Sequence, residues 1–258
     1  MLSADDGHTL TGTYGFRVGS GRAPGAATVE GERPEPWAVV TRWLTFFAGG
    51  VSAACLIWVG LAVRNGSGGD KKRQLAVAGI AAGIGLLATA LEPFLQSRFP
   101  PSGVLRPSLS EALSALPDAW WLRPGGLVIT VVSTVLIYPL LNRDRGLQIA
   151  ASLGAAGGLI ALLGLSLTTH VAARQKWEAI STLSVITHEW AIGLWVGGLA
   201  ALALSWPHSR DIADEISDRD PIRVFSRAAL PLALIGIGAG IANSSLILPS
   251  VDALWESD

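Results

Sequence analysis

The chain has 258 residues, of which 50% are hydrophobic and only 15% are charged, and its formal net charge is −1. Soluble domains carry about 25% charged residues, so the composition argues against an ordinary soluble fold, and the charge balance gives no indication of a nucleic-acid partner. The one cysteine, Cys55, excludes a disulfide within the chain.

Residues 1–19 differ in character from the rest of the chain and are expected to lie outside the membrane. They lack the charged start and apolar core of a signal peptide. The alternation of Tyr14, Phe16 and Val18 predicts a β-strand. Because one strand is not stable alone, it would be the last strand of a sandwich. Residues 20–36, which are rich in Gly, Pro and Glu, are predicted to form a linker.

A group of candidate metal ligands precedes that strand. Asp5, Asp6 and His8 bring carboxylates and an imidazole together, a donor set that suits Cu(II) or Zn(II). Asp-Gly-His is also ordinary turn chemistry. The spacing alone therefore leaves both a metal site and a plain turn open.

Six apolar segments are long enough to cross a membrane, since a spanning helix needs about 20 such residues. Spanning strands would be shorter and would alternate. The sequence therefore predicts an all-α polytopic membrane protein with a bundle of about six transmembrane helices. The predicted spans are 37–63, 74–95, 125–141, 147–169, 182–206 and 226–248, and residues 249–258 would form an outer tail.

Lysine and arginine are distributed unequally between the loops. Ten lie in or beside the loops that follow the first, third and fifth spans, whereas the opposite loops carry five and the N-terminal tail adds three. Because cytoplasmic loops collect positive charge, we expect the first set to lie in the cytoplasm and both termini to lie outside. The run DKKR at 70–73 strengthens this bias.

Four ionisable residues lie near the predicted outer ends of the spans: Glu92, His170, His188 and Glu189. On a helical rise of about 1.5 Å per residue, His170 and His188 lie at similar depth. Ionisable groups inside a membrane are costly and usually functional, so we expect His188 and Glu189 to point into the bundle. A histidine hydrogen-bonded between helices is the alternative for His188, and Glu189 could instead fix the tautomer of a ligating histidine. Arg42 could snorkel or pair with Glu92.

The longest predicted outer loop, at about 96–124, contains a helix-start signal. Ser108 and Glu111 have the spacing of a capping box. This spacing predicts a short amphipathic helix on the membrane surface, with Trp120 and Trp121 at the headgroups.

Small residues four positions apart recur in the spans and predict close packing between helices. On the fifth span, Glu189, Gly193 and Gly197 share one face, and His188 and Trp195 share the neighbouring one. The glycine pairs with this spacing are Gly79/Gly83, Gly154/Gly158, Gly193/Gly197 and Gly236/Gly240.

Two segments together resemble known copper proteins. SADDGHTLTGTYGFRVG (3–19) resembles the closing motif of the CopC domain, a small periplasmic β-sandwich that binds Cu(II). THVAARQKWEAISTLSVITHEWAIGLWVGGL (169–199), followed by VFSRAALPLALIGIGAGIANS (224–244), resembles the membrane domain of the copper-resistance protein D (CopD) family. This order is that of CopC–CopD fusion proteins. Residues 1–19 would then be a CopC-like remnant and 37–248 a CopD-like transmembrane domain, truncated at both ends.

The resemblance implies copper import or transfer across the cytoplasmic membrane of a prokaryote, linked to copper resistance and homeostasis. Its implied partners are the copper ion, the lipid bilayer and a periplasmic or extracellular copper-binding protein of CopC type. The matching positions are His8 with Asp5 or Asp6 in the remnant, and His170, His188, Trp195, Gly197 and Gly198 in the membrane. Glu189 joins the predicted metal ligands, and Glu92, Trp195, Gly197 and Gly198 would support the site or serve packing.

The ligand types leave the copper oxidation state open between Cu(I) and Cu(II). Met1 is the only methionine, so a methionine ladder for Cu(I) is excluded, whereas imidazole and carboxylate favour Cu(II) or Zn(II). Two other functions fit the sequence. One is a haem-binding membrane cytochrome with His170 and His188 as axial ligands, and the other is a non-transporting anchor or sensor for a copper-binding outer domain. No nucleophile–base arrangement suggests an enzyme.

Overall fold

The computed structural model describes residues 2–3, 9–10, 35–65, 71–100, 106–141, 143–168, 178–205 and 221–247. The candidate ligands Asp5, Asp6, His8 and His170 lie outside these residues, as does the strand predicted at 14–18. Two short strands, β1 (Leu2–Ser3) and β2 (Thr9–Leu10), pair in antiparallel fashion.

Long helices make up almost all of the described chain, as the apolar runs predict. Six of them are long and apolar enough to cross a membrane, which confirms the all-α polytopic fold. They are α1 (Pro36–Asn65), α2 (Lys71–Arg98), α4 (Leu122–Ile137), α5 (Asp144–Leu167), α6 (Glu178–Ser205) and α7 (Pro221–Ile247). The 3-10 helices η1 (Asp118–Trp121) and η2 (Tyr138–Leu140) extend α4 at its two ends.

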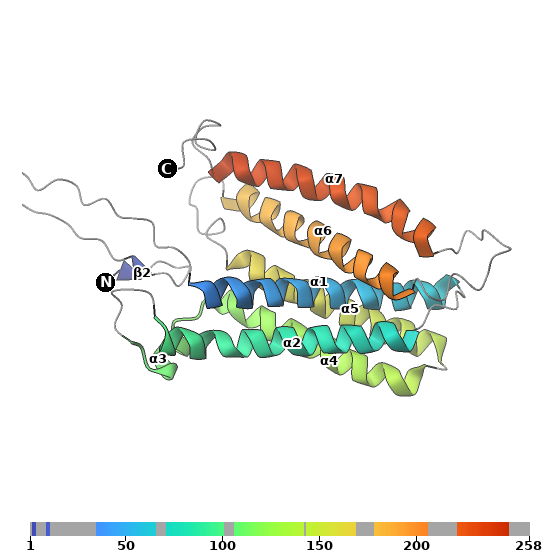
Figure 1. Cartoon of the computed structure of the whole chain (residues 1–258), viewed down its shortest axis with the longest axis horizontal. Coiled ribbons are helices and arrows are strands. Elements are labelled where there is room, and N and C mark those ends of the chain that lie inside the picture. The colour runs from blue at the N-terminus through green and yellow to red at the C-terminus, as the bar shows by residue number, and fades with distance from the viewer. Residues whose placement is uncertain are drawn as a thin grey trace, which may run out of the picture.

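Successive spanning helices run in opposite directions, so their termini gather at two ends of the bundle (Figure 1). The short helix α3 (Leu109–Ser114) marks one of these ends, which we call the α3 end. Helices α1, α4 and α6 begin there, and α2, α5 and α7 finish there. Most of the polar groups discussed below lie at this end.

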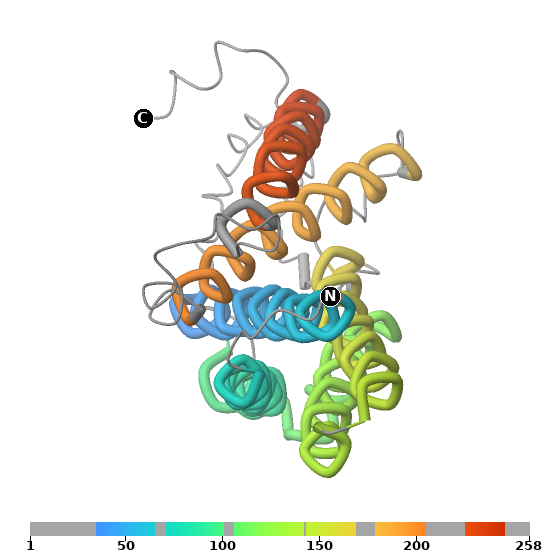
Figure 2. The backbone as a smooth tube through the Cα atoms, turned by 90° about the vertical axis from the view of Figure 1, so that its right-hand side faces the viewer, coloured from blue at the N-terminus to red at the C-terminus, as the bar shows by residue number. Residues whose placement is uncertain are grey.

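Helix α1 lies at the centre of the bundle and packs against α2, α5 and α6, and Figure 2 shows it between α2 and α6. Glycine makes these approaches close. A Cβ at Gly50 would lie 2.6 Å from the carbonyl oxygen of Gly193 on α6, and one at Gly158 on α5 would lie 2.7 Å from the carbonyl oxygen of Gly49. Because these distances are too short for a carbon–oxygen contact, any larger residue would push the helices apart.

The predicted glycine packing is confirmed in α5, α6 and α7 but only in part in α2. Gly79 faces Thr134 of α4, whereas a Cβ at Gly83 would meet nothing within 4 Å. Gly83 lies on the exposed face of α2, beside Ile84 and Leu87. The spacing of small residues predicted a contact surface, but it did not show which glycine would face a neighbour.

The capping box predicted in the long loop is confirmed at the start of α3. The Ser108 amide donates to Glu111 Oε2 at 2.7 Å, and the Glu111 amide donates to Ser108 Oγ at 3.3 Å. The hydroxyl of Ser108 and then its amide hold the pKa of the Glu111 carboxyl below its usual range. Of the two tryptophans predicted at the headgroups, Trp121 is exposed, but Trp120 is buried with 4% of its surface exposed. The prediction for Trp120 was wrong because its indole turns inward to a carboxylate.

Candidate functional site

His188 lies on α6, and its ring faces α7. Its Nδ1 lies 2.8 Å from the carbonyl oxygen of Gly236. Because a carbonyl can only accept a hydrogen bond, Nδ1 carries the proton, and Nε2 of the neutral ring keeps its lone pair. A Cβ at Gly240 would lie 3.0 Å from His188 Cε1, so α7 presents its backbone and its smallest residue to the imidazole.

Glu189 follows His188 in the chain but faces a different helix. Its Oε2 accepts a hydrogen bond of 2.6 Å from Ser166 Oγ on α5. Successive residues of an α-helix are rotated by about 100°, so the two adjacent side chains serve two separate helix interfaces. Both point into the bundle, as predicted, but they do so toward different neighbours.

Two of the other predicted site residues on α6, Gly197 and Gly198, serve packing. A Cβ at Gly197 would collide with the carbonyl oxygen of Gly50, and one at Gly198 would lie 2.5 Å from the ring of Phe225 on α7. Trp195 is partly buried. The two glycines let α1 and α7 approach α6, and none of the three residues offers a metal-binding atom to His188.

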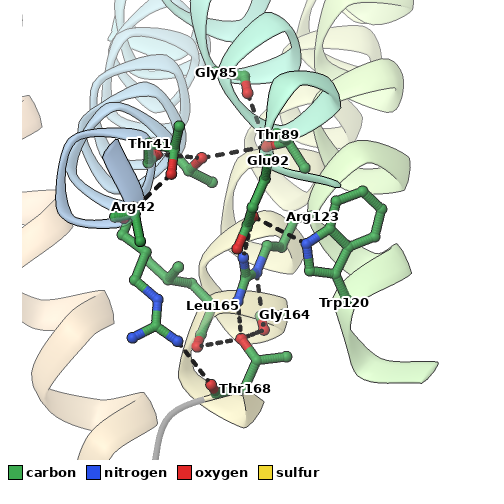
Figure 3. A network of polar contacts seen from close by, with 12 residues as sticks. Thr41, Arg42, Gly85, Thr89, Glu92, Trp120, Arg123, Gly164, Leu165 and Thr168 are labelled. Atoms are coloured by element: carbon green, nitrogen blue, oxygen red, sulfur yellow. Dashed lines mark hydrogen bonds and ion pairs between the residues drawn. The ribbon is translucent and has the colours of Figure 1, made fainter. Parts of the chain in front are cut away.

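Figure 3 shows a second polar group at the α3 end, centred on Arg123 of α4. The Arg123 side chain is almost fully buried, and its Nη1 forms a 2.9 Å ion pair with Glu92 Oε2 on α2. The indole Nε1 of Trp120 donates to the same carboxylate oxygen at 3.0 Å. Glu92 therefore has its charge offset by Arg123 and a second donor from η1.

Two arginines converge on the end of α5 (Figure 3). Arg123 donates through Nη2 to Thr168 Oγ1 and through Nε to the Gly164 carbonyl at 3.5 Å. Arg42 of α1 donates through Nη2 to the Thr168 carbonyl at 3.0 Å. The last carbonyls of a helix lack partners within the helix and carry partial negative charge. The two guanidinium groups thus bind α1 and α4 to the end of α5. Of the two roles predicted for Arg42, pairing with Glu92 is not the one seen, because Arg42 donates to Thr168 and Glu92 pairs with Arg123.

Hydroxyl groups extend this network along the helices. Thr45 Oγ1 of α1 and Thr89 Oγ1 of α2 lie 3.2 Å apart. Each also lies within hydrogen-bond distance of a carbonyl of its own helix, so one hydroxyl can donate to the other while that other donates to its backbone. Ser166, on the last turn of α5, connects the same region to Glu189. The α3 end is therefore held by polar contacts that run from α2 through α4 and α5 to α6.

Sequence reasoning missed Arg123, Ser166 and Thr168. Arg123 is one of the five cations that the sequence places in the outer loops. It directly precedes an apolar run, however, and an ionisable group in that position signals a buried partner. Ser166 and Thr168 carried no signal, since hydroxyl residues are common in membrane helices.

Within the described residues, no three His, Cys, Asp or Glu side chains are placed so that together they could hold a metal ion. A site at His188 would thus need ligands from outside these residues, from solvent, or from a partner. His170 lies outside the described residues.

A scan against protein-family models, a search of curated proteins and a search of solved structures each found no match to this chain.

Proposed function

We propose that this protein handles copper at the cytoplasmic membrane of a prokaryote. It would take up a copper ion at the α3 end of the bundle and transfer it across the membrane, in support of copper resistance and homeostasis. The α3 end would face outward, as the distribution of lysine and arginine predicts. The copper ion is the transported substrate.

The observation that carries this proposal is the hydrogen bond from His188 Nδ1 to the Gly236 carbonyl. Metal-binding histidines typically donate one ring N–H to a carbonyl or carboxylate, which orients the ring and leaves the other nitrogen to the metal. His188 has that arrangement inside a membrane helix, where an imidazole without a function is costly. Its Nε2 would be the copper ligand, and His170, from the end of the preceding span, would be the second.

Glu189 would offset part of the charge of the ion. Its carboxylate makes no ion pair with any described residue, whereas Glu92 is already paired with Arg123. Ser166 fixes the Glu189 carboxylate from α5, and the arginines in turn fix the end of α5. In this proposal Glu92 serves packing, and Glu189, which faces the neighbouring interface of α6, is the carboxylate that offsets the charge of the ion. Imidazole and carboxylate ligands favour Cu(II).

The copper content of the purified protein tests the proposal. The informative variant is His188→Asn, because the side-chain amide of Asn can still donate toward the Gly236 carbonyl but offers no counterpart of Nε2. We expect the wild-type protein in lipid nanodiscs to bind copper stoichiometrically and His188→Asn to lose that ion. His208→Ala, a histidine replacement elsewhere in the chain, should keep it.

Two outcomes would contradict copper handling. In one, the wild-type protein binds no copper at equilibrium, or His188→Asn binds as much as the wild type. In the other, the purified protein carries haem with a Soret band that is lost in His188→Asn, which would favour the membrane cytochrome instead.

A further inference from the structure

Three polar side chains on α6 form a stripe along α7. Ser181, Ser184 and His188 are spaced by three and four residues and therefore share one face of the helix. Ser184 Oγ donates to the Ala239 carbonyl at 2.8 Å, and His188 Nδ1 bonds the Gly236 carbonyl at 2.8 Å. We call this contact the α6–α7 seam, made by Ser181, Ser184 and His188 on one side and by residues 236–243 on the other.

The register of these two hydrogen bonds extends to a third pair. Moving four residues back along α6, from 188 to 184, moves the contact three residues forward along α7, from 236 to 239. Continuing this register by one more turn would bring Ser181 opposite Asn243, nearest the α3 end of the seam. On a rise of about 1.5 Å per residue, Ser181 and His188 are about 10 Å apart along α6.

This third pair differs from the other two in its hydrogen bonding. Ser181 is 1% exposed, and neither its Oγ nor the buried Oδ1 of Asn243 has a hydrogen-bond partner in the part of the chain that the structure describes. The presence of Ser184 and His188 between the two helices is explained by their hydrogen bonds to α7, since polar bonds of this kind hold membrane helices together. These bonds do not explain two buried oxygens that the register assigns to the next turn of the same seam and that have no partner among the described residues.

Buried oxygens in proteins are nearly always paired with a protein group, an ordered water or an ion. Ser181 Oγ and Asn243 Oδ1 both offer lone pairs, which suit the water shell of a cation or the cation itself. Ser181 lies two turns from His188 on the same face of α6, toward the α3 end, and the register places Asn243 of α7 at that level. Ser184, midway between them and the imidazole, continues the line of oxygen atoms.

We propose that the α6–α7 seam is a hydrated entry path for a metal cation. Ser181 and Asn243 supply the first oxygen atoms that the cation meets, and His188 lies at the inner end of the path. The identity of the ion as copper rests on the proposed function. The hydration of the seam and its preference for cations do not, and they can be measured separately.

Thiol accessibility tests the path directly. Cys55 is the one native cysteine and is fully buried, so Cys55→Ala gives a cysteine-free background. Ser181→Cys, Ser184→Cys and Asn243→Cys are introduced singly into it. The protein, in lipid nanodiscs, is treated with a cationic or an anionic methanethiosulfonate reagent of similar size, and labelling rates are read by mass spectrometry.

The matched controls are Leu183→Cys and Ile241→Cys. Leu183 and Ile241 are 65% and 66% exposed and belong to the outward faces of the same helices, at nearly the same depth as the seam positions. We expect the three seam thiols to react at least tenfold faster than the controls, and faster with the cationic reagent than with the anionic one. Seam thiols as slow as the controls, or faster with the anion, would overturn the proposal.

A second measurement does not depend on introduced thiols. Asn243→Leu removes the oxygen, whereas Ser245→Ala removes an exposed hydroxyl that bonds the Ala242 carbonyl of its own helix. The association of copper is followed by the quenching of tryptophan fluorescence. We expect Asn243→Leu to slow this association tenfold or more and to leave the final stoichiometry unchanged. An unchanged rate would count against the path. If the wild-type protein binds no copper, the proposed function fails, and the labelling pattern alone decides whether the seam conducts cations.

Discussion

Arg123 of α4 and Glu92 of α2 form a 2.9 Å ion pair whose arginine side chain is only 2% exposed. The pair is embedded in further contacts, because Trp120 donates to the same carboxylate and Arg123 also reaches the end of α5. A buried charge pair is costly to assemble, but it is far more costly to break on one side. Its main role at this end of the bundle is therefore to fix three helices relative to one another.

The first prediction concerns that pair. Glu92→Leu should destabilise the protein by about 3–5 kcal/mol, because it leaves the Arg123 guanidinium buried without its counter-charge. The double variant Glu92→Leu/Arg123→Leu should lose much less than the two single variants added together, since no charge is stranded. Reversible denaturation in mixed micelles gives the three free energies of unfolding. Additive losses would show that the ion pair is not the main interaction of either residue.

The second prediction concerns the link between α5 and α6. Ser166→Ala removes the donor to Glu189 and should cost about 1–3 kcal/mol of stability, because it leaves a partly buried carboxylate without this hydrogen bond. It should also weaken copper binding, since the carboxylate is no longer held in one orientation. Ser245→Ala, which removes a hydroxyl on the exposed side of α7, is the control and should change neither quantity. Equal effects of the two variants would mean that the Ser166–Glu189 contact is unimportant.

The membrane fold could be predicted because it depends on the length of apolar runs, a property of the chain alone. The site could be predicted only in part, because a helix fixes the direction of each side chain but not which neighbour it meets. His188 and Glu189 are adjacent in the sequence, yet one contacts α7 and the other α5. The helical spacing put them on neighbouring faces of one span, but it gave no indication of which helix each face would meet.

The pair Trp120 and Trp121 shows the same limit of prediction from sequence for single residues. Trp120 and Trp121 are equally amphipathic, and both suit a membrane interface. The turn at η1 directs Trp120 to Glu92 and leaves Trp121 exposed. Which of the two is buried depends on a carboxylate 28 positions away in the chain, and local pattern carries no such information.

The third prediction concerns the contact of α1 with α6. Gly50→Ala would place a Cβ 2.6 Å from the Gly193 carbonyl oxygen, so we expect a loss of about 1–3 kcal/mol from overpacking. Gly60→Ala is the control on the same helix, because its Cβ would meet nothing within 4 Å. It should be neutral, or stabilising by up to about 1 kcal/mol from the better helix propensity of alanine. Thermal unfolding of the two variants side by side measures the difference, and similar midpoints would contradict the close approach.

The last prediction concerns the capping box of α3. In the folded protein the pKa of Glu111 should lie below the usual glutamate value of about 4.3, because the Ser108 hydroxyl and amide bind the ionised carboxylate. A carboxyl whose pKa is lowered by folding stabilises the folded form above its unfolded pKa, and this contribution is lost as the pH falls through the folded value. The α3 cap should therefore persist at neutral pH and open in acid.

Carbon-detected NMR titration of the Glu111 carboxyl in the whole protein gives the pKa directly. Ser108→Ala should raise it toward the usual value, whereas Ser114→Ala, which removes a hydroxyl bonded to the Glu111 carbonyl, should leave it low. A pKa of Glu111 that does not respond to Ser108→Ala would show that another group stabilises the carboxylate.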